Sequence, residues 1–499
     1  MDSNHKLDPL FNPKGVVVVG ASTHPGKFGF VALHNILSGG FSGPVYATNK
    51  ENVSLLGIET IKSLSEIPNK TVDFAMICVP SQLVPETLLE ASKIGVKAAF
   101  IVSGGYGEIG GDGITAEQEL VRLANDLDMA IAGPNGQGFV SSPANLCSQI
   151  VAPNPPPGKI AIASQSGNLL SAFMNLSRQY NIGISRAIST GNQTCLDTSD
   201  YIDYFTKDTE TSVIVSYIEG VSNGRRFYEA VKTASAVKPV IVIRGGSSPE
   251  GAKAASSHTG ALATDDKVFE GMLKQAGAFL AGDPQMAYEW ACAFATQPKL
   301  GGQNTVVLTQ AGGWGVLTAD AISKSSLNLV DLPNDLISKV DSILPPRWSR
   351  GNPIDLAGGE RRETIPKMID LVLSHKAVDA LIFLGLGIQG NIARLFTESD
   401  YLDSSMERII NFHRNQEKAY VESLLKASKK WDKPVLVATE LGNADPNNPA
   451  ISELRREKWF CHYSGSNAVR ALENLNIYAK YQISRSTDIG LIQESEGKL

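Results

Sequence analysis

A histidine with small neighbours is the first candidate for chemistry in this sequence. His258 lies in the stretch Ser-His-Thr-Gly-Ala at residues 257–261, shortly after the Gly-rich residues 244–248. Small neighbours leave an imidazole uncovered and able to move, whereas a histidine packed in a core usually has bulkier company. Neutral imidazole is also a competent nucleophile toward phosphorus. Most of the seven histidines are expected on the surface or in structural roles, and His258 is the candidate for a reacting group.

Two glycine-bearing turns are candidates for holding a phosphoryl group. Each follows an apolar run with a small polar residue, Gln, a small residue and Gly, and then a helical pattern. A helix N-terminus offers unpaired N–H donors and roughly half a positive charge. Two such ends facing each other would hold a dianion such as phosphohistidine without a cationic side chain, although both turns can also be ordinary turns. The candidate phosphate-binding residues are Ser164, Gln165, Ser166 and Gly167 in the first turn, and Ala311, Gly312 and Gly313 in the second.

A carboxylate is expected in the same domain as His258. Glu219 follows an apolar run and precedes Gly220, which predicts that it stands at the end of a strand. Ligands of parallel sheets bind at these carboxyl ends. Glu219 would then hold the second ring nitrogen of His258 and fix its tautomer. The alternative is an ordinary residue at the edge of the sheet.

A third glycine turn, near the N-terminus, predicts a nucleotide site. Four valines at 16–19 lead into it, and glycines between a strand and a helix let backbone N–H groups approach a phosphate. The next predicted strand ends in Lys50, where the NAD fingerprint has an acidic residue. A lysine suits a phosphorylated ribose, as in coenzyme A or NADP; the alternative is an exposed turn with two solvated lysines. The candidate residues are Gly20, Ala21, Ser22, Lys27, Gly29 and Lys50.

Short apolar runs alternate with amphipathic helical stretches throughout, which predicts α/β domains with parallel sheets. Residues 154–158 (Asn-Pro-Pro-Pro-Gly) and 297–302 break the pattern. The shared opening of the passages that follow these breaks predicts an internal duplication of one flavodoxin-like unit. The charged helical stretch 396–431 is expected to be a solvated excursion without a site. The predicted domains are residues 1–150, 151–300 and 301–485, followed by a loose polar tail at 486–499.

The bulk composition excludes several classes of protein. The net charge of −6 argues against a nucleic-acid or anionic-membrane partner. The five cysteines are scattered without metal-ligand spacing, which predicts reduced thiols in a cytoplasm and no metal site. No signal peptide is expected at the N-terminus, and no apolar run approaches the roughly 20 residues of a membrane span.

With these residues in view, the chain resembles the α-subunit type of the ADP-forming (NDP-forming) acyl-CoA synthetases, which belong to the succinyl-CoA synthetase superfamily. The resemblance covers nearly the whole chain, and the motif around His258 is highly specific. It implies a Rossmann-like CoA-binding domain followed by two flavodoxin-like domains. It also implies further CoA-contacting residues, in the loops at 78–81, 103–108 and 133–135: Val79, Pro80, Ser103, Gly104 and Asn135. Other motifs similar to the family's stand at residues 189–192 and 351–356.

The resemblance implies an acid–CoA ligase reaction. Acyl-CoA, phosphate and ADP would interconvert with a carboxylate, CoA and ATP through an acyl phosphate and a phosphorylated His258. Glu219 matches the residue that supports this histidine in the family. Three domains fill the chain and leave no ATP-grasp segment, so an ATP-grasp β-type partner subunit would supply the ATP/ADP site and Mg²⁺, and an oligomer is expected.

The sequence departs from the family at several positions. Gly136 stands where Cys is frequent, Trp314 where Pro is common, and Asn168 where small residues are usual. The Thr-Asn-Lys sequence at 48–50 replaces a usual Asn-Pro pair. Because Trp314 and Asn168 flank the predicted phosphate and acyl site, an unusual choice of acyl group is expected.

Two other classes of protein are also compatible with the sequence. One is a CoA-binding or acyl-CoA-binding regulatory protein with reduced catalysis, against which the intact histidine motif speaks. The other is an NADP-linked oxidoreductase that uses the first domain. The second and third passages offer no site for hydride transfer, which places the oxidoreductase last.

Overall fold

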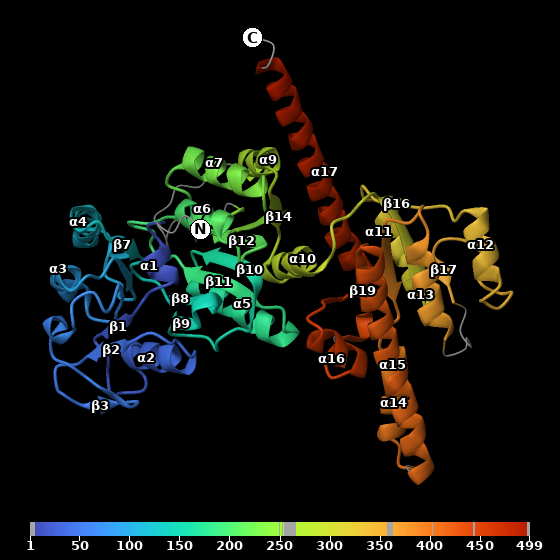
Figure 1. Cartoon of the computed structure of the whole chain (residues 1–499), viewed down its shortest axis with the longest axis horizontal. Coiled ribbons are helices and arrows are strands. Elements are labelled where there is room, and N and C mark those ends of the chain that lie inside the picture. Colours follow the sequence, from blue (N-terminus) through green and yellow to red (C-terminus); the bar gives the residue numbers. More distant parts are fainter. Residues whose placement is uncertain are drawn as a thin grey trace. The chain divides into compact units, whose positions relative to one another are not determined.

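The structure is a computed structural model that divides into two compact units (Figure 1). Unit 1 comprises Met1–Gln179 and Gly183–Ala291, and unit 2 comprises Tyr180–Ile182 and Cys292–Leu499. Among the described helices, none is both long enough and apolar enough to span a bilayer. The structure describes residues 5–248, 250–251, 253, 266–356, 363–401, 403–442 and 445–496.

The first sheet of unit 1 is parallel and has the strand order β2-β1-β5-β6-β7. The four valines of β1 are buried because helices cover both faces of the sheet, a setting that favours continuous apolar runs. Val16 and Val18 belong to one core cluster and Val17 and Val19 to another, as alternation of side chains across a strand requires. The strands are β1 (Val16–Val19), β2 (Val45–Thr48), β5 (Phe74–Ile77), β6 (Ala98–Ile101) and β7 (Ala130–Ala132), with a separate hairpin of β3 (Ser54–Leu55) and β4 (Ile58–Glu59). The helices are α1 (Asp8–Phe11), α2 (Phe28–Ser38), α3 (Val84–Lys93) and α4 (Asp112–Asp126).

The second sheet of unit 1 has the order β14-β13-β12-β10-β11-β8-β9, parallel except where β8 pairs with β11 and β9. Strands β8 and β9 precede the predicted domain boundary at residue 150, yet they join this sheet because they cover the open edge of β11. Its strands are β8 (Gly138–Ser141), β9 (Leu146–Gln149), β10 (Pro157–Ser164), β11 (Ile184–Ser189), β12 (Val213–Ile218), β13 (Val240–Arg244) and β14 (Phe279–Ala281). The helices that follow them along the chain are α5 (Gly167–Tyr180), α6 (Thr198–Lys207), α7 (Gly224–Ser235), α9 (Asp266–Ala276) and α10 (Pro284–Thr296).

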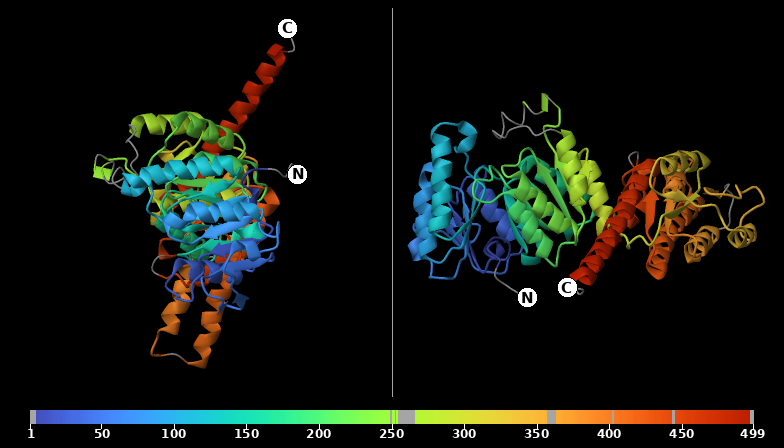
Figure 2. Two further views of the ribbon diagram at one scale, coloured as in Figure 1. Left: turned by 90° about the vertical axis from the view of Figure 1, so that its left-hand side faces the viewer. Right: turned by 90° about the horizontal axis from the view of Figure 1, so that it is seen from above.

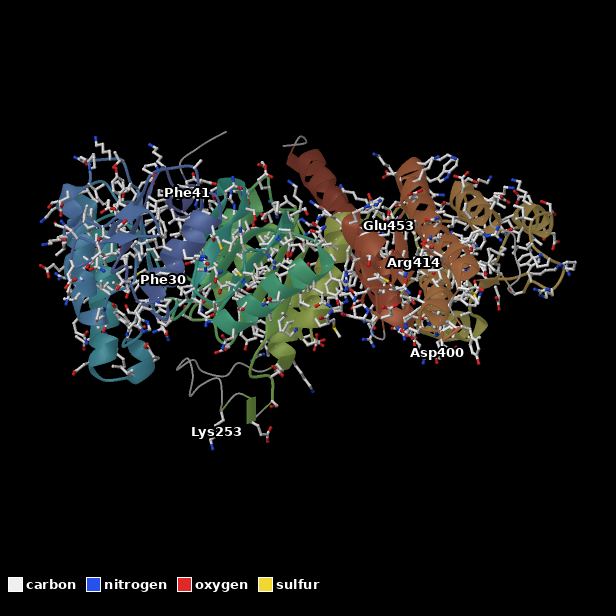
Figure 3. The ribbon with its side chains drawn as sticks, turned by 90° about the horizontal axis from the view of Figure 1, so that it is seen from below. Phe30, Phe41, Lys253, Asp400, Arg414 and Glu453 are labelled. Carbon is white, nitrogen blue, oxygen red and sulfur yellow. The ribbon has the colours of Figure 1, made fainter. Side chains whose placement is uncertain are left out.

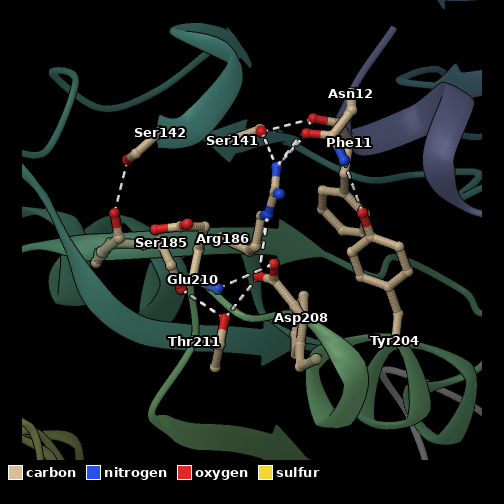
Figure 4. Close-up of polar contacts among 12 residues, drawn as sticks. Phe11, Asn12, Ser141, Ser142, Ser185, Arg186, Tyr204, Asp208, Glu210 and Thr211 are labelled. Carbon is tan, nitrogen blue, oxygen red and sulfur yellow. Dashed lines mark hydrogen bonds and ion pairs between the residues drawn. The ribbon is translucent and has the colours of Figure 1, made fainter. Parts of the chain in front are cut away.

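A buried arginine ties the N-terminal helix to this second sheet (Figure 4). The side chain of Arg186 on β11 is only 3% exposed and pairs with Asp208, Nε to Oδ2 3.2 Å. Its Nη1 donates to the carbonyl of Phe11 at 3.0 Å and to Oδ1 of Asn12 at 3.0 Å, and it also contacts the hydroxyl of Ser141. Arg186 therefore joins three segments that are far apart in sequence.

Unit 2 contains a third parallel sheet, of order β16-β15-β18-β19-β20, with β17 paired to β15. The expected α/β class, with mostly parallel sheets, is confirmed. The strands are β15 (Asn304–Thr309), β16 (Asn328–Leu329), β17 (Ile354–Asp355), β18 (Ala380–Leu384), β19 (Val435–Ala438) and β20 (Cys461–His462). The helices are α11 (Gly312–Ser323), α12 (Asn334–Asp341), α13 (Thr364–Ser374), α14 (Ile388–Thr397), α15 (Ser404–Trp431), α16 (Pro449–Arg456) and α17 (Gly465–Glu496).

Two helical segments of unit 2 differ from the sequence-based expectation. Helices α14 and α15 lie side by side as a hairpin (Figure 2; Asp400 and Arg414 are labelled in Figure 3). One face of α15 is buried because it also packs on α13 and α16, and it carries Glu417, which is fully buried. Helix α17 continues to Glu496, through residues expected to form a loose tail, since no proline interrupts it.

Candidate functional site

The first glycine turn brings the ends of three strands of the first sheet together. Gly20 has a φ of +85°, and a Cβ there would lie 2.9 Å from Val79 Cγ1 at the end of β5. Its N–H donates to Oγ1 of Thr48, the last residue of β2, at 3.1 Å. Gly29 in the first turn of α2 has no room for a side chain, because its Cβ would stand 2.1 Å from the carbonyl oxygen of Gly20. The backbone of β1 and the start of α2 therefore approach each other directly.

The cationic candidates lie beside this turn. Lys27 is the N-cap residue of α2, is exposed, and makes no side-chain cap, so the helix start is not closed by a side chain. Asn49 donates from Nδ2 to the carbonyl of Ala21 at 2.8 Å, which ties the end of β2 to the glycine turn. Lys50 follows directly and is exposed. The candidates from the first and second strands thus share one edge of the sheet.

The loops after β6 and β7 meet a loop of the second sheet through a carboxylate. Glu108 accepts from the N–H of Gly105 at 2.5 Å and from Nδ2 of Asn192 at 2.6 Å. Asn135 donates from Nδ2 to Oδ1 of Asn192 at 3.2 Å, and a Cβ on Gly104 would fall between Glu108 and Asn135. Burial alone would raise the pKa of Glu108, but the hydrogen bonds from Asn192 and from backbone N–H groups hold this pKa below its usual range.

Glu108 and Asn192 were not among the residues assigned to the site from sequence. Both lie inside motifs that the sequence singled out, at 103–108 and 189–192. Their pairing joins segments 84 residues apart, and only the topology reveals it. The remaining candidates, Val79, Pro80 and Ser103, lie directly after β5 and β6, at the same edge as Gly20.

In the second sheet, a glutamine holds the turn after β10 against the turn after β12. Gln165 donates from Nε2 to the carbonyl of Gly220 at 3.1 Å, and its Oε1 accepts from the N–H of Gly220 at 3.1 Å and from the N–H of Glu219. The hydroxyl of Ser164 donates to the carbonyl of Ser166 at 2.7 Å, which closes the turn before α5. The structure therefore brings Gln165 and Glu219 together at the carboxyl edge of the sheet.

The carboxylate of Glu219, directly after β12, has Tyr217 of that strand as a neighbour. The hydroxyl of Tyr217 donates to Oε1 of Glu219 at 3.1 Å. Burial, together with the Glu219 carboxylate, raises the pKa of Tyr217 well above its ordinary value. Gly245 passes so close that a Cβ would stand 2.4 Å from the Tyr217 hydroxyl oxygen. Gly245, directly after β13, therefore lies against both Tyr217 and Glu219.

The turn after β15 in unit 2 repeats the arrangement of the turn after β10. The hydroxyl of Thr309 donates to the carbonyl of Ala311 at 2.8 Å, as Ser164 does two residues onward. Gln310 donates from Nε2 to the carbonyl of Gly385 at 3.1 Å, in the turn after the neighbouring strand β18. In both turns a hydroxyl donates to the carbonyl two residues onward and the glutamine Nε2 donates to a glycine carbonyl after the neighbouring strand, as expected for a duplicated unit. The two helix starts belong to different units, and their facing each other stays a prediction.

His258 and its neighbours lie outside the described residues. Arg244, which precedes that segment, contacts two residues of α9, which follows it. Its Nη1 pairs with Oδ1 of Asp266 at 2.6 Å, and its guanidinium carbon lies 4.7 Å from the ring centre of Phe269. Lys253 is exposed and lies away from the sheets of its unit (Figure 3). Arg244 at the end of β13 and Asp266 at the start of α9 are therefore tied to each other.

Two of the positions where the sequence departs from the family pattern, Gly136 and Asn168, have local partners. A Cβ on Gly136 would stand 2.6 Å from Cζ of Phe100, so Phe100 occupies the space of a larger residue. Asn168 accepts from Nε2 of Gln137 at 3.2 Å. Among the described residues, no cluster of His, Cys, Asp and Glu has the arrangement of a metal site.

Comparison with known proteins agrees with this architecture. The chain matches the family "CoA binding domain" over residues 14–141, "Succinyl-CoA ligase like flavodoxin domain" over 157–294 and "Ligase-CoA domain" over 305–394. The match to a CoA-binding family supports coenzyme A over NADP as the ligand of the first domain.

Relatives that match about three quarters of this chain carry acid–CoA ligase names. The chain is 39% identical over 382 residues to the acetate–CoA ligase [ADP-forming] I subunit alpha of Pyrococcus furiosus, covering 76% of this chain and 82% of that protein. It is 35% identical to acetate–CoA ligase [ADP-forming] I of Archaeoglobus fulgidus, in a match that covers 75% of this chain and 54% of that protein. The structure matches the dinucleotide forming acetyl-coenzyme A synthetase 1 of Ca. Korarchaeum cryptofilum in complex with phosphate and ADP, with a TM-score of 0.83, 32% identity, and coverage of 96% and 98% of the two chains.

These matches confirm the predicted resemblance and do not favour the alternative of a catalytically reduced CoA-binding regulator. They extend from the first glycine turn to the third sheet and include relatives named as α subunits. The chain belongs to the ADP-forming acid–CoA ligases of the succinyl-CoA synthetase superfamily.

Proposed function

We propose that this chain is the α-type subunit of an ADP-forming acyl-CoA synthetase in which His258 carries the phosphoryl group. The partner would be an ATP-grasp β-type subunit that holds ATP or ADP and Mg²⁺, and the substrate a small carboxylic acid such as the acetate named in the relatives. The observation that carries the proposal is the position of Glu219. Gln165 holds it at a carboxyl edge of the second sheet, beside the chain that leads to His258.

The first sheet would bind coenzyme A at its carboxyl edge. The close approach of Gly20 and Gly29 leaves the backbone at the start of α2 open to a diphosphate, and helix N-termini favour such anions. Lys27 and Lys50 would pair with the phosphate on the ribose. The loops with Val79, Pro80, Ser103, Gly104 and Asn135 would line the remainder of the cofactor, which supplies the thiol.

The reaction would proceed in three steps. An oxygen of inorganic phosphate attacks the acyl carbon of acyl-CoA, the C–S bond breaks, and CoA leaves as the thiol after protonation. A ring nitrogen of His258 then attacks phosphorus, the bond between phosphorus and the carboxyl oxygen breaks, and the carboxylate leaves. The phosphoryl group passes from His258 to ADP to give ATP.

Residues of this chain would stabilise the charges that develop during these steps. Glu219 would accept a hydrogen bond from the second ring nitrogen of His258 and stabilise the positive charge on the phosphorylated ring. The N–H groups at the starts of α5 and α11, after Ser166 and Ala311, would hold the phosphoryl oxygens. Each donor is fixed before the reaction by the hydroxyl and glutamine bonds of its turn, which reduces the cost of organising the site.

The cofactor site is tested by adding one methyl group. Gly29→Ala places a Cβ where only 2.1 Å separates it from the Gly20 carbonyl, so the helix start must move away from β1. Overpacking of this kind costs about 1–3 kcal/mol, and we expect the CoA dissociation constant to rise about tenfold. Calorimetric titration with CoA measures it. Gly271→Ala is the matched control, since Gly271 lies in α9 with open space around it; equal affinities in the two variants would contradict the assignment.

The phosphoryl carrier is tested by labelling this chain alone with radioactive phosphate and a panel of acyl-CoAs. We expect acid-labile, base-stable label on the protein, which peptide mapping places between Lys253 and Asp266. Label that is stable to acid, or that maps elsewhere, would contradict a phosphohistidine at position 258. If label requires the partner subunit, repeating the assay with the complex decides the question.

A further inference from the structure

The side chains of Tyr217 and Glu219 form a pair at the carboxyl end of β12. Side chains two residues apart along a strand point to the same face of the sheet, which brings these two together. The hydroxyl of Tyr217 donates to Oε1 of Glu219 at 3.1 Å. Hydrogen bonds to an ionised acceptor are roughly twice as strong as neutral ones. The tyrosine therefore restrains the carboxylate that the proposed mechanism uses.

Glu219 is held at both of its ends. Gln165 accepts at Oε1 from the backbone N–H of Glu219, and from the N–H of Gly220 at 3.1 Å, which fixes the backbone. Tyr217 holds the carboxylate at the far end of the side chain. A glutamate fixed only through its backbone could still turn among several rotamers. The bond from Tyr217 therefore reduces the conformational entropy that the carboxylate loses when it acts.

Gly245 leaves the space in which the tyrosine and the glutamate meet. Its N–H donates to the carbonyl of Ile218 at 2.8 Å, which continues the pairing of β12 with β13 past the end of the strands. A Cβ on Gly245 would stand 2.4 Å from the Tyr217 hydroxyl oxygen and 3.3 Å from Cγ of Glu219. The φ of Gly245 lies outside the left-handed region. Space, and not backbone conformation, therefore requires glycine at this position.

The phenol of Tyr217 keeps its proton under working conditions. Burial, followed by the Glu219 carboxylate, raises the pKa of Tyr217 above its ordinary value. A group that stays protonated near neutral pH does not exchange protons with a substrate as a general acid or base. Its hydroxyl remains a hydrogen-bond donor, so Tyr217 has the chemistry of a residue that positions another.

The duplicated unit provides an internal comparison. The last residue of β10 lies opposite Tyr217, and the last residue of β15 lies opposite Leu384. By this register, Leu384 and Leu386 in unit 2 take the places of Tyr217 and Glu219 in unit 1. Both leucines are buried, at 1% and 0% exposure. The donor and the carboxylate are therefore present together in one unit and replaced together in the other, which indicates that the hydroxyl serves the carboxylate.

We infer that Tyr217 is a positioning residue for phosphoryl transfer, whose hydroxyl sets the carboxylate of Glu219 in a space that Gly245 leaves open. This inference rests on the proposed function, in which Glu219 accepts a hydrogen bond from a ring nitrogen of His258. The carboxylate can accept from both donors, because its two oxygens offer about four acceptor sites. A carboxylate fixed in advance stabilises charge on the ring without reorganising during the step.

Removal of the hydroxyl tests this role in the complete enzyme. Tyr217→Phe takes away one oxygen atom and leaves the ring. We expect the rate of phosphoenzyme formation to fall about tenfold, because a hydrogen bond to a charged group is lost, while the CoA dissociation constant stays unchanged. Rapid quenching with labelled phosphate and acyl-CoA measures the rate. Tyr201→Phe is the matched control and should keep the full rate, since this buried hydroxyl on α6 has no hydrogen-bond partner among the described residues.

A double-mutant cycle with Gly245→Ala distinguishes positioning from general loss of structure. Alone, the added Cβ should push the Tyr217 hydroxyl away from Glu219 and lower the same rate by a similar factor. In the Tyr217→Phe background it should lower the rate by no more than about twofold further, because the oxygen that the methyl group displaces is already absent.

The outcomes separate this inference from the proposed function. A full rate in Tyr217→Phe overturns the inference, and so do two effects that multiply in the double variant. Weaker CoA binding in Tyr217→Phe assigns the tyrosine a structural role and overturns it as well. Glu219→Gln tests the proposed function separately: a full rate in that variant contradicts the role of Glu219 itself, whereas a reduced rate beside an unaffected Tyr217→Phe contradicts only the role of the tyrosine.

Discussion

His258→Ala should reduce turnover of the complete enzyme by at least about a thousandfold, while the affinity for CoA stays unchanged. The expected loss is large because the side chain is the covalent carrier, and removal of a covalent nucleophile costs far more than removal of a binding contact. CoA affinity should persist because the glycine turn of Gly20 and Gly29 belongs to the first sheet, whereas position 258 follows β13 of the second. The measurement pairs steady-state acyl-CoA formation with calorimetric titration of CoA.

A second histidine provides the control for this prediction. His34→Ala removes an exposed imidazole on α2 and should change neither turnover nor CoA affinity. Loss of CoA binding in His258→Ala would indicate misfolding, and His258→Asn then serves as the milder replacement. Normal turnover in a folded His258 variant would remove the phosphohistidine from the mechanism and leave Glu219 without its assigned partner.

The sequence could predict the sheets because their signal is local. A run such as Val16–Val19 is apolar at every position only where both faces are covered, and glycine after it indicates a tight turn. The repeated pattern of Gln165 and Gln310 with their neighbours likewise predicted two equivalent turns. What each glutamine bonds to, however, depends on which strand lies beside it, and Gly220 and Gly385 are 55 and 75 residues away.

Other features could not be predicted, because the sequence does not distinguish a buried polar side chain from an exposed one. Glu417 lies in a charged helix that was expected to be solvated, yet burial raises its pKa to about 7. Asn192 and Glu108 lie in recognisable motifs, but their hydrogen bond depends on two sheets meeting. The proline-rich break at 154–158 suggested a domain boundary, whereas the pairing of β8 with β11 depends on a free strand edge that no local pattern reports.

Arg186→Leu should destabilise unit 1 by about 3–5 kcal/mol, the cost of breaking a buried ion pair from one side. The substitution leaves Asp208, whose side chain is 8% exposed, without its counter-charge. It also removes the donor to the Phe11 carbonyl that ties α1 to the second sheet. The measurement is urea unfolding, following the first cooperative transition of the chain.

An exposed ion pair in the same sheet region shows why burial decides the size of this effect. Lys159 and Glu210 are 3.0 Å apart, Nζ to Oε2, and both side chains are 49% exposed. Because water screens such a pair, Lys159→Ala should cost less than about 1 kcal/mol. The double variant Arg186→Leu with Asp208→Leu should recover part of the loss, since paired apolar replacements leave no uncompensated charge. Equal losses for the buried and the exposed pair would contradict this prediction, because they would mean that the charge of Asp208 contributes little to stability.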